Sequence, residues 1–226
     1  MIRFILRTAN FLFGRTIQKA HAALSGSLRY LTRPRQIDRN YFDYFRLSML
    51  ELVSSEINNS KVEGNVAELG VYQGKFARYI NKFFPNRTCY LFDTFEGFDP
   101  RDTAIEQEKS LSSGKQNFSD TSVQAVLRRM PHPEKCVPVK GFFPDSAVGL
   151  EDRFVFVSLD ADLFEPIYQG LLFFYPRLTR GGYIFIHDFN NENYKGARTA
   201  VEQFCSEMQV PFIPLPDECG SAVISK

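Results

Sequence analysis

Several residue types that mark common protein classes are scarce in this chain. Its 226 residues include no tryptophan, three histidines and four cysteines. No two of the cysteines show CxxC spacing, which argues against a zinc knuckle or a dithiol redox motif. We expect all four to be reduced and structural, as is usual in a cytosolic protein. The length and the apolar fraction of 44% are those of one globular domain with a substantial core.

Positive charge is concentrated at one end of the chain. Residues 1–37 hold seven of the 27 basic residues and no acid, so the remainder has 20 basic against 26 acidic residues. A main domain with this excess of acids does not present the basic surface that nucleic-acid binding requires. We therefore expect no nucleic-acid partner.

Apolar residues recur at near-helical spacing in the first turns of the chain, from Ile2 to Phe13, with arginines between them. We predict a basic amphipathic helical extension over residues 1–40. Its charges are too frequent for a transmembrane span, and it lacks a signal-peptide cleavage pattern. Two interpretations stay open: residues 1–37 contact an anionic membrane surface, or the helix packs on its own domain or on a second subunit of a homo-oligomer. The protein is accordingly expected to be cytoplasmic, with a membrane-peripheral position under the first interpretation.

From residue 41 onwards, helical and strand patterns alternate up to residue 226. The helix predicted for residues 41–58 carries Phe45, Met49, Val53 and other apolar residues on one side. Buried strands are predicted at 65–71, 89–93, 137–141, 154–160 and 183–188, with two more at 211–215 and 222–225. Residues 99–120 are polar and are expected to form a mobile loop or lid. The alternation predicts an α/β fold with a mainly parallel, seven-stranded sheet and helices on both faces.

A glycine loop follows the first predicted strand, with the spacing Glu68-x-Gly70-x-x-x-Gly74. Glycines at such a turn allow a ligand to approach the backbone closely. The spacing is neither the GxGxxG of dinucleotide-binding proteins nor a Walker A motif. A carboxylate at this point repels a pyrophosphate but suits a ligand with an ammonium group and ribose hydroxyls. S-adenosylmethionine has both, together with a sulfonium.

A second acid, Asp93, ends the next predicted strand. A carboxylate at this position is suited to accept hydrogen bonds from both hydroxyls of a ribose. Together with the glycine loop, it favours a ribose-bearing cofactor over an arbitrary nucleoside-like ligand.

Two later strands also end in polar residues, Asp160 with Asp162 and His187 with Asp188. Since ligands of such sheets bind beyond the carboxyl ends of the strands, we expect these side chains to converge with Glu68 and Asp93 on one crevice. Three carboxylates in close proximity require a cation or a proton. We therefore predict a divalent metal held by Asp160, His187 and Asp188, which would lower the pKa of a substrate hydroxyl.

These motifs resemble the macrocin O-methyltransferase family (TylF/MycF/NovP-like), which methylates sugar hydroxyls of antibiotics. The resemblance covers about residues 40–226 and rests on five segments taken in order: 67–74, 90–98, 158–164, 175–178 and 181–189. It implies a Rossmann-like class I methyltransferase fold for residues 41–226, transfer of a methyl group from S-adenosylmethionine to a hydroxyl oxygen of a sugar or other small molecule, and use of magnesium.

Carried over residue by residue, the resemblance makes Asp162 the general base and Asp160 and Asp188 metal ligands. The predicted cofactor contacts are Glu68, Gly70, Tyr72, Gly74, Asp93, Thr94, Gly141, Phe142 and Asp160. The family's antibiotic enzymes have two adjacent acids where this chain has His187-Asp188, and an imidazole is a softer ligand than magnesium prefers. His187 can select manganese, leave the site without metal, or act as the base. Two other functions stay open, an NAD-dependent oxidoreductase and a non-catalytic nucleoside-binding module.

Overall fold

The computed structural model describes residues 5, 8–9, 11–14, 28, 31–37 and 43–226. The chain forms two compact units, Met1–Gln36 and Ile37–Lys226. In the first unit, residues 5, 8–9 and 11–14 are helical, and the rest of the predicted amphipathic helix lies outside the described residues. None of the helices in the described part is both long and apolar enough to cross a membrane.

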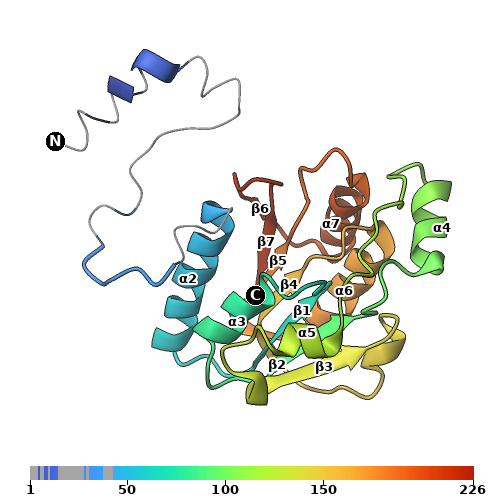
Figure 1. Ribbon diagram of the computed structural model, residues 1–226, viewed down its shortest axis with the longest axis horizontal. Coiled ribbons are helices and arrows are strands. Elements are labelled where there is room, and N and C mark those ends of the chain that lie inside the picture. Colours follow the sequence, from blue (N-terminus) through green and yellow to red (C-terminus); the bar gives the residue numbers. More distant parts are fainter. Residues whose placement is uncertain (1–4, 6–7, 10, 15–27, 29–30, 38–42) are drawn as a thin grey trace. The chain divides into compact units, whose positions relative to one another are not determined.

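The second unit is built on a seven-stranded sheet (Figure 1). Its strands are β1 (Asn65–Leu69), β2 (Cys89–Asp93), β3 (Cys136–Lys140), β4 (Phe154–Leu159), β5 (Leu178–Ile186), β6 (Ile213–Pro214) and β7 (Ala222–Ser225). Their order in the sheet is β3-β2-β1-β4-β5-β7-β6. All pairings among the first five strands are parallel, and β7 pairs antiparallel with both β5 and β6. The predicted seven-stranded, mainly parallel sheet is confirmed.

Helices cover both faces of the sheet. They are α2 (Tyr44–Asn59), α3 (Ala77–Phe83), α4 (Pro100–Glu108), α5 (Val123–Leu127), α6 (Phe164–Arg177) and α7 (Lys195–Met208). Apolar residues of α2, α3 and α5 join one buried cluster, and those of α6 and α7 join another on the opposite face. All six residues of β4 are buried, as expected for a central strand that is covered on both sides.

Helix α2 buries a side that matches the predicted one only in part, since Val53 is buried as predicted. Phe45 was expected in the core, but its side chain is 51% exposed. The buried side carries Leu47, Leu50, Arg46 and Glu51. The prediction was wrong for Phe45, because apolar spacing alone assigns charged residues to solvent, and here the buried side includes two of them.

Residues 99–120 do not form the predicted continuous loop, since α4 occupies Pro100–Glu108. Asp99 caps this helix by accepting a hydrogen bond from the backbone N–H of Arg101 at 2.9 Å. Proline at the first helical position has a φ angle already suited to a helix and no N–H to leave unpaired. The Asp-Pro start therefore outweighs the polar composition that suggested a loop.

The five strands β1 to β5 point in one direction, so their carboxyl ends meet at one edge of the sheet. The segments that follow these ends begin at Gly70, Thr94, Gly141, Asp160 and His187. In an open parallel sheet this edge is where ligands bind.

Candidate functional site

A cavity of about 360 Å³ lies at the carboxyl edge of the sheet. Its volume is that of a small-molecule site, for which roughly 300–1,000 Å³ is usual. Among the residues on its wall are eleven that the sequence predicted for the site: Glu68, Gly70, Tyr72, Asp93, Thr94, Gly141, Phe142, Asp160, Asp162, His187 and Asp188. The expected convergence on one crevice is therefore confirmed.

The cavity wall has two parts that differ in construction. The β1–β3 end consists of residues 68–73, 93–94, 97–99 and 141–143, which lie at and beyond the carboxyl ends of the first three strands. The β4–β5 end consists of Asp160, Asp162, His187 and Asp188, together with Arg46 from α2. These two names are used below in this sense.

A glycine is required at position 70 because the segment that follows β4 packs directly against it. Its φ is +87°, and a Cβ atom there would lie 2.1 Å from the carbonyl oxygen of Asp160. The two segments are joined because the N–H of Asp160 donates to the carbonyl oxygen of Leu69 at 2.8 Å. This glycine therefore serves the contact between the loops after β1 and β4, in addition to leaving room in the cavity.

Gly74, predicted as a cofactor contact, is absent from the cavity wall. A Cβ atom on it would approach the side chains of Met130 and Val126 at 2.8 and 3.0 Å. The second glycine of the motif thus allows the loop to pack against α5 and the residues after it. A direct cofactor contact at this position stays a prediction, and the spacing of the motif also satisfies a packing requirement.

Asp93 is held in place by the backbone of two loops. Its Oδ2 accepts from the N–H of Tyr72 at 2.7 Å, and its Oδ1 accepts from the N–H of Phe95 at 2.6 Å. An ionised carboxylate has about four lone-pair positions. Two remain for hydroxyl groups in the cavity, so Asp93 is oriented and still able to accept from a ribose.

The wall near β3 is aromatic. Gly141 and Phe142 follow that strand, and the guanidinium carbon of Arg101 lies 3.4 Å from the centre of the Phe142 ring. Arg101 also forms ion pairs with Asp99 and with Asp145. These contacts fix the face of a flat apolar surface against which a planar base can lie.

The segment that follows α4 closes the cavity from one side. The Phe118 ring packs edge-on against Tyr72, with ring centres 5.0 Å apart. Asp120 accepts from the Tyr72 hydroxyl at 2.6 Å and from the side-chain amide of Gln73 at 2.9 Å. The last part of the predicted lid is therefore attached to the loop that follows β1.

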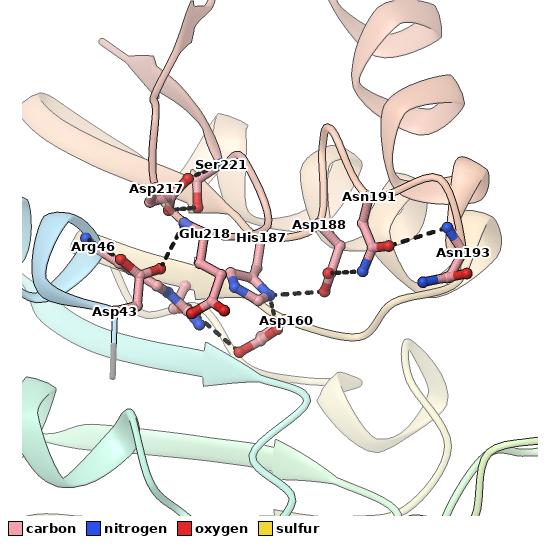
Figure 2. Close-up of polar contacts among 11 residues, drawn as sticks. Asp43, Arg46, Asp160, His187, Asp188, Asn191, Asn193, Asp217, Glu218 and Ser221 are labelled. Carbon is pink, nitrogen blue, oxygen red and sulfur yellow. Dashed lines mark hydrogen bonds and ion pairs between the residues drawn. The ribbon is translucent and has the colours of Figure 1, made fainter. Parts of the chain in front are cut away.

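The β4–β5 end is built from side chains that interact directly with one another (Figure 2). Nη2 of Arg46 donates to Oδ2 of Asp160 at 2.9 Å and to Oγ of Ser158 at 3.2 Å. Nδ1 of His187 lies 2.9 Å from Oδ1 of Asp160 and 2.7 Å from Oδ2 of Asp188. The side-chain amide of Asn191 donates to the other oxygen of Asp188 at 2.6 Å. Each of the two carboxylates thus has a partner on both oxygens.

These contacts determine which groups are charged. Burial opposes ionisation of Asp160, but Arg46 and His187 hold its pKa well below the usual range. Burial and Arg46 lower the pKa of His187, yet the two carboxylates beside it outweigh them and raise that pKa well above its usual value. The pKa of Asp188 is lowered because His187 and Asn191 outweigh the effect of burial. Two cations and two anions therefore balance at this end.

Asp162 is the carboxyl without a cationic partner at hydrogen-bond distance in the described part of the chain. Burial, followed by the charges of Asp188 and Asp160, raises its pKa well above the usual value. A hydrogen bond with Asp188 acts in the same direction. Its φ of +60° places the residue in the left-handed region, which is uncommon for a non-glycine residue.

Glu68 ends β1 beneath the cavity and is 1% exposed. Burial raises its pKa well above the usual value, and the charge of Asp160 adds to this. Its Oε2 has no hydrogen-bond partner in the described part of the chain. A positively charged group in the cavity would favour ionisation of this carboxyl.

Two buried charged residues of the cavity wall were not predicted as site residues from the sequence. Arg46 and Asp102 lie on helices, 4% and 8% exposed, and both face the cavity. The available signal for Arg46 was its place within a helix of apolar residues, where charged side chains are seldom buried without a partner. Nothing in the spacing of Asp102 distinguishes it from a solvated helix residue.

Known proteins resemble this chain in sequence and in fold. A family model described as macrocin-O-methyltransferase (TylF) matches residues 36–216. Mycinamicin III 3''-O-methyltransferase of Micromonospora griseorubida is 28% identical over 167 residues, a match covering 64% of this chain and 62% of that enzyme. The chain thus spans less than two thirds of the length of this curated relative.

Two solved structures show the same fold. The O-methyltransferase NovP superposes with a TM-score of 0.67 at 18% identity, covering 80% of this chain and 79% of that chain. TomG from Streptomyces achromogenes, an O-methyltransferase solved in complex with SAM, gives a TM-score of 0.53 at 11% identity, covering 79% of this chain and 80% of that chain.

Strand order, the glycine loop after β1 and the fixed acid after β2 define a Rossmann-like fold of the class I methyltransferase type. Within that class, the chain belongs to the macrocin-O-methyltransferase (TylF) family, whose model covers most of its length. The family and the relatives named above are O-methyltransferases.

Proposed function

We propose that this protein transfers the methyl group of S-adenosylmethionine to a hydroxyl oxygen of a sugar-containing small molecule. The observation that carries the proposal is the cavity that joins the oriented carboxylate of Asp93 at one end to the carboxyl of Asp162, which has no cationic partner at hydrogen-bond distance, at the other. Family membership supports the reaction type. The sequence match to the mycinamicin 3''-O-methyltransferase, which covers 62% of that enzyme, supports a sugar acceptor.

The β1–β3 end fits the chemical groups of S-adenosylmethionine. Asp93 retains lone pairs for the ribose hydroxyls, and Phe142 offers an apolar face for the base. Glu68 also lines the cavity, and a sulfonium or ammonium group beside it would favour its ionised form. When bound, the cofactor supplies an electrophilic methyl group.

At the β4–β5 end, Asp162 serves as the general base. In its ionised form, the Asp162 carboxylate accepts the proton of the acceptor hydroxyl, whose oxygen forms the new bond to carbon while the electron pair of the broken S–C bond stays on sulfur. A base with a raised pKa is better matched to this task at neutral pH than an ordinary carboxylate. Holding both reactants in one cavity also reduces the entropic part of the barrier, by roughly 7–11 kcal/mol in well-oriented systems.

The role of His187 as base stays a prediction that the contacts do not favour. Its Nδ1 lies between two carboxylates, so this nitrogen carries a proton and donates it to them. The arrangement favours His187 as a cation that orients Asp160 and Asp188.

The first test of the proposal is calorimetry of the full chain with S-adenosylmethionine and S-adenosylhomocysteine. We expect saturable binding of both and no binding of NAD. Binding of NAD alone would support the oxidoreductase alternative, and absence of any binding would contradict the proposal. A screen of sugar-containing acceptors with labelled methyl groups then identifies the substrate class.

The predicted metal, magnesium or manganese, is not part of the proposed reaction steps. Asp160, Asp162 and Asp188 offer oxygen atoms within 4.8 Å of one another, as do ligand atoms of His187, Asp188 and Cys219. However, the two carboxylates assigned as ligands already accept from Arg46, His187 and Asn191. As these side chains stand, they do not fit a magnesium ion, and the steps above involve none.

Membrane contact through residues 1–37, assembly into a homo-oligomer and a cytoplasmic location stay predictions. For the first, the full chain and a chain starting at Asp38 are compared for binding to anionic vesicles. Equal binding by the two would contradict membrane contact. Sedimentation of the same two proteins tests whether the extension contributes to an oligomer.

A further inference from the structure

A buried arginine and a partly buried histidine lie where a metal ion was expected. Arg46 is 4% exposed, although arginine is among the residues least often buried. Its guanidinium carbon lies 3.8 Å from the centre of the Phe76 ring, and its Nη2 contacts Asp160 and Ser158. A guanidinium held on one side by an aromatic ring and on the other by a carboxylate is a fixed charge, because it does not lose its proton in proteins.

The positions that a metal would use are occupied by hydrogen-bond donors. Magnesium requires near-octahedral oxygen ligands at about 2.0–2.1 Å. One oxygen of Asp160 accepts from Arg46 and the other faces Nδ1 of His187, and this nitrogen also faces Asp188. A divalent cation inserted among these carboxylates would displace Arg46 and His187 from the acids. The positive charges of these two side chains would also repel it.

Resting on the proposed function, we infer that Arg46 and His187 take the place of a divalent metal at the β4–β5 end. They neutralise Asp160 and Asp188 and fix their orientation, which makes both of them positioning residues. Asp162 is left as the carboxyl that faces the acceptor hydroxyl. Methyl transfer by this chain then requires proton removal by Asp162 and no metal-bound oxygen.

The inference is tested by direct manganese binding, which does not depend on an identified acceptor. Free Mn²⁺ has an electron paramagnetic resonance signal that is lost when the ion is bound. We expect the full-length wild-type protein to leave the signal unchanged when protein is in excess. Saturable binding of one Mn²⁺ to the wild type, lost in Asp160→Asn, would overturn the inference.

Variants that remove the cations provide the converse arm. Arg46→Gln with His187→Asp frees Asp160 and adds an acid, so at least a tenfold gain in Mn²⁺ affinity is expected. His187→Asp alone serves if the double variant does not fold, and it should gain affinity in the same direction. A folded variant without any gain would contradict the claim that the cations occupy the place of the metal.

A matched control and a second readout complete the design. Arg87→Met removes another partly buried guanidinium, whose partners are the carbonyl oxygens of Val62 and Gly64, and should not change Mn²⁺ binding. Affinity for S-adenosylhomocysteine is measured on the same samples in EDTA. If the wild type does not bind S-adenosylhomocysteine, the proposed function is contradicted, whereas the conclusion from manganese binding is not affected.

Discussion

The two ends of the cavity are constructed in different ways. At the β1–β3 end, backbone groups do most of the positioning: two N–H groups orient Asp93, and a glycine at a positive φ lets two loops meet. At the β4–β5 end, side chains position one another, and charges are neutralised by Arg46 and His187. The first arrangement is suited to binding an invariant cofactor, and the second is suited to proton transfer.

The acids of the cavity show the same contrast. Asp160 and Asp188 have cationic or amide partners, and their pKa values are lowered. Glu68 and Asp102 are buried away from such partners, and their pKa values are raised, that of Asp102 to about 7. A buried carboxyl thus takes its charge state from the neighbours that the fold provides.

Removing the base should have the largest effect and should be confined to the β4–β5 end. For Asp162→Asn we expect methyl transfer to fall by about 10²–10⁴-fold, the usual contribution of a general base. Affinity for S-adenosylhomocysteine should stay within about twofold, since the cofactor groups contact the other end. Single-turnover transfer to the acceptor and calorimetry measure the two quantities. Turnover at the wild-type rate would show that another group takes the proton.

The place where the two ends meet should be the least tolerant of added volume. Gly70→Ala puts a Cβ atom against the carbonyl oxygen of Asp160 at a positive φ. We expect a loss of about 2–5 kcal/mol in the free energy of unfolding, from strain and overpacking together. Chemical denaturation measures it.

Gly149→Ala is the matched control for this substitution. Gly149 has a φ of +84° but no atom within 4 Å of the added Cβ. Gly149→Ala should therefore lower the free energy of unfolding by about 1 kcal/mol, which is the part due to backbone strain alone. Equal losses at the two glycines would mean that the contact between the loops after β1 and β4 contributes nothing.

Removing the oriented carboxylate of the β1–β3 end should affect binding alone. Asp93→Ala deletes an acceptor of the ribose hydroxyls, so affinity for S-adenosylhomocysteine should fall by about 10–100-fold, as for one or two hydrogen bonds to a charged group. Asp152→Asn is the control, because Asp152 accepts from Asn65 and Tyr90 and does not line the cavity. Unchanged affinity of the Asp93 variant, measured by calorimetry, would contradict the assigned ribose contact.

The smallest expected effect concerns the unpaired acid on α4. Burial, followed by the charges of Asp99 and Glu165, raises the pKa of Asp102 to about 7. Because the folded pKa exceeds the unfolded value of about 3.9, stability associated with the protonated form is complete below pH ~4 and is lost as pH rises through ~7. Asp102→Asn does not ionise and should be more stable than wild type at pH 8, by on the order of 1–3 kcal/mol, with no difference at pH 4.

Asp99→Asn provides a control of opposite sign. Hydrogen bonds from Arg101 lower the pKa of Asp99, so its contribution to stability is present above the unfolded pKa and is lost as pH falls. Thermal unfolding between pH 4 and pH 8 distinguishes the two variants. If Asp102→Asn is more stable than wild type by the same amount at every pH, ionisation of Asp102 is not the cause of the difference.

The sequence by itself determined the alternation of strands and helices, the seven-stranded sheet and the convergence of its polar strand ends. These follow from local rules, since apolar periodicity, glycine turns and strand direction are properties of neighbouring residues. The same rules failed for α4, where an Asp-Pro helix start lies in a polar segment. They also did not show that Gly74 packs against Val126 of α5.

Only the tertiary structure decided how the acid cluster is neutralised. Arg46 is separated from Asp160 by 114 positions in the chain, and no pattern of spacing connects them. Three carboxylates near an imidazole indicate that a cation is needed, but they do not say which one. The fold brings a guanidinium from α2 to that place, because burying an unpaired charge costs more than any local preference of the helix can offset.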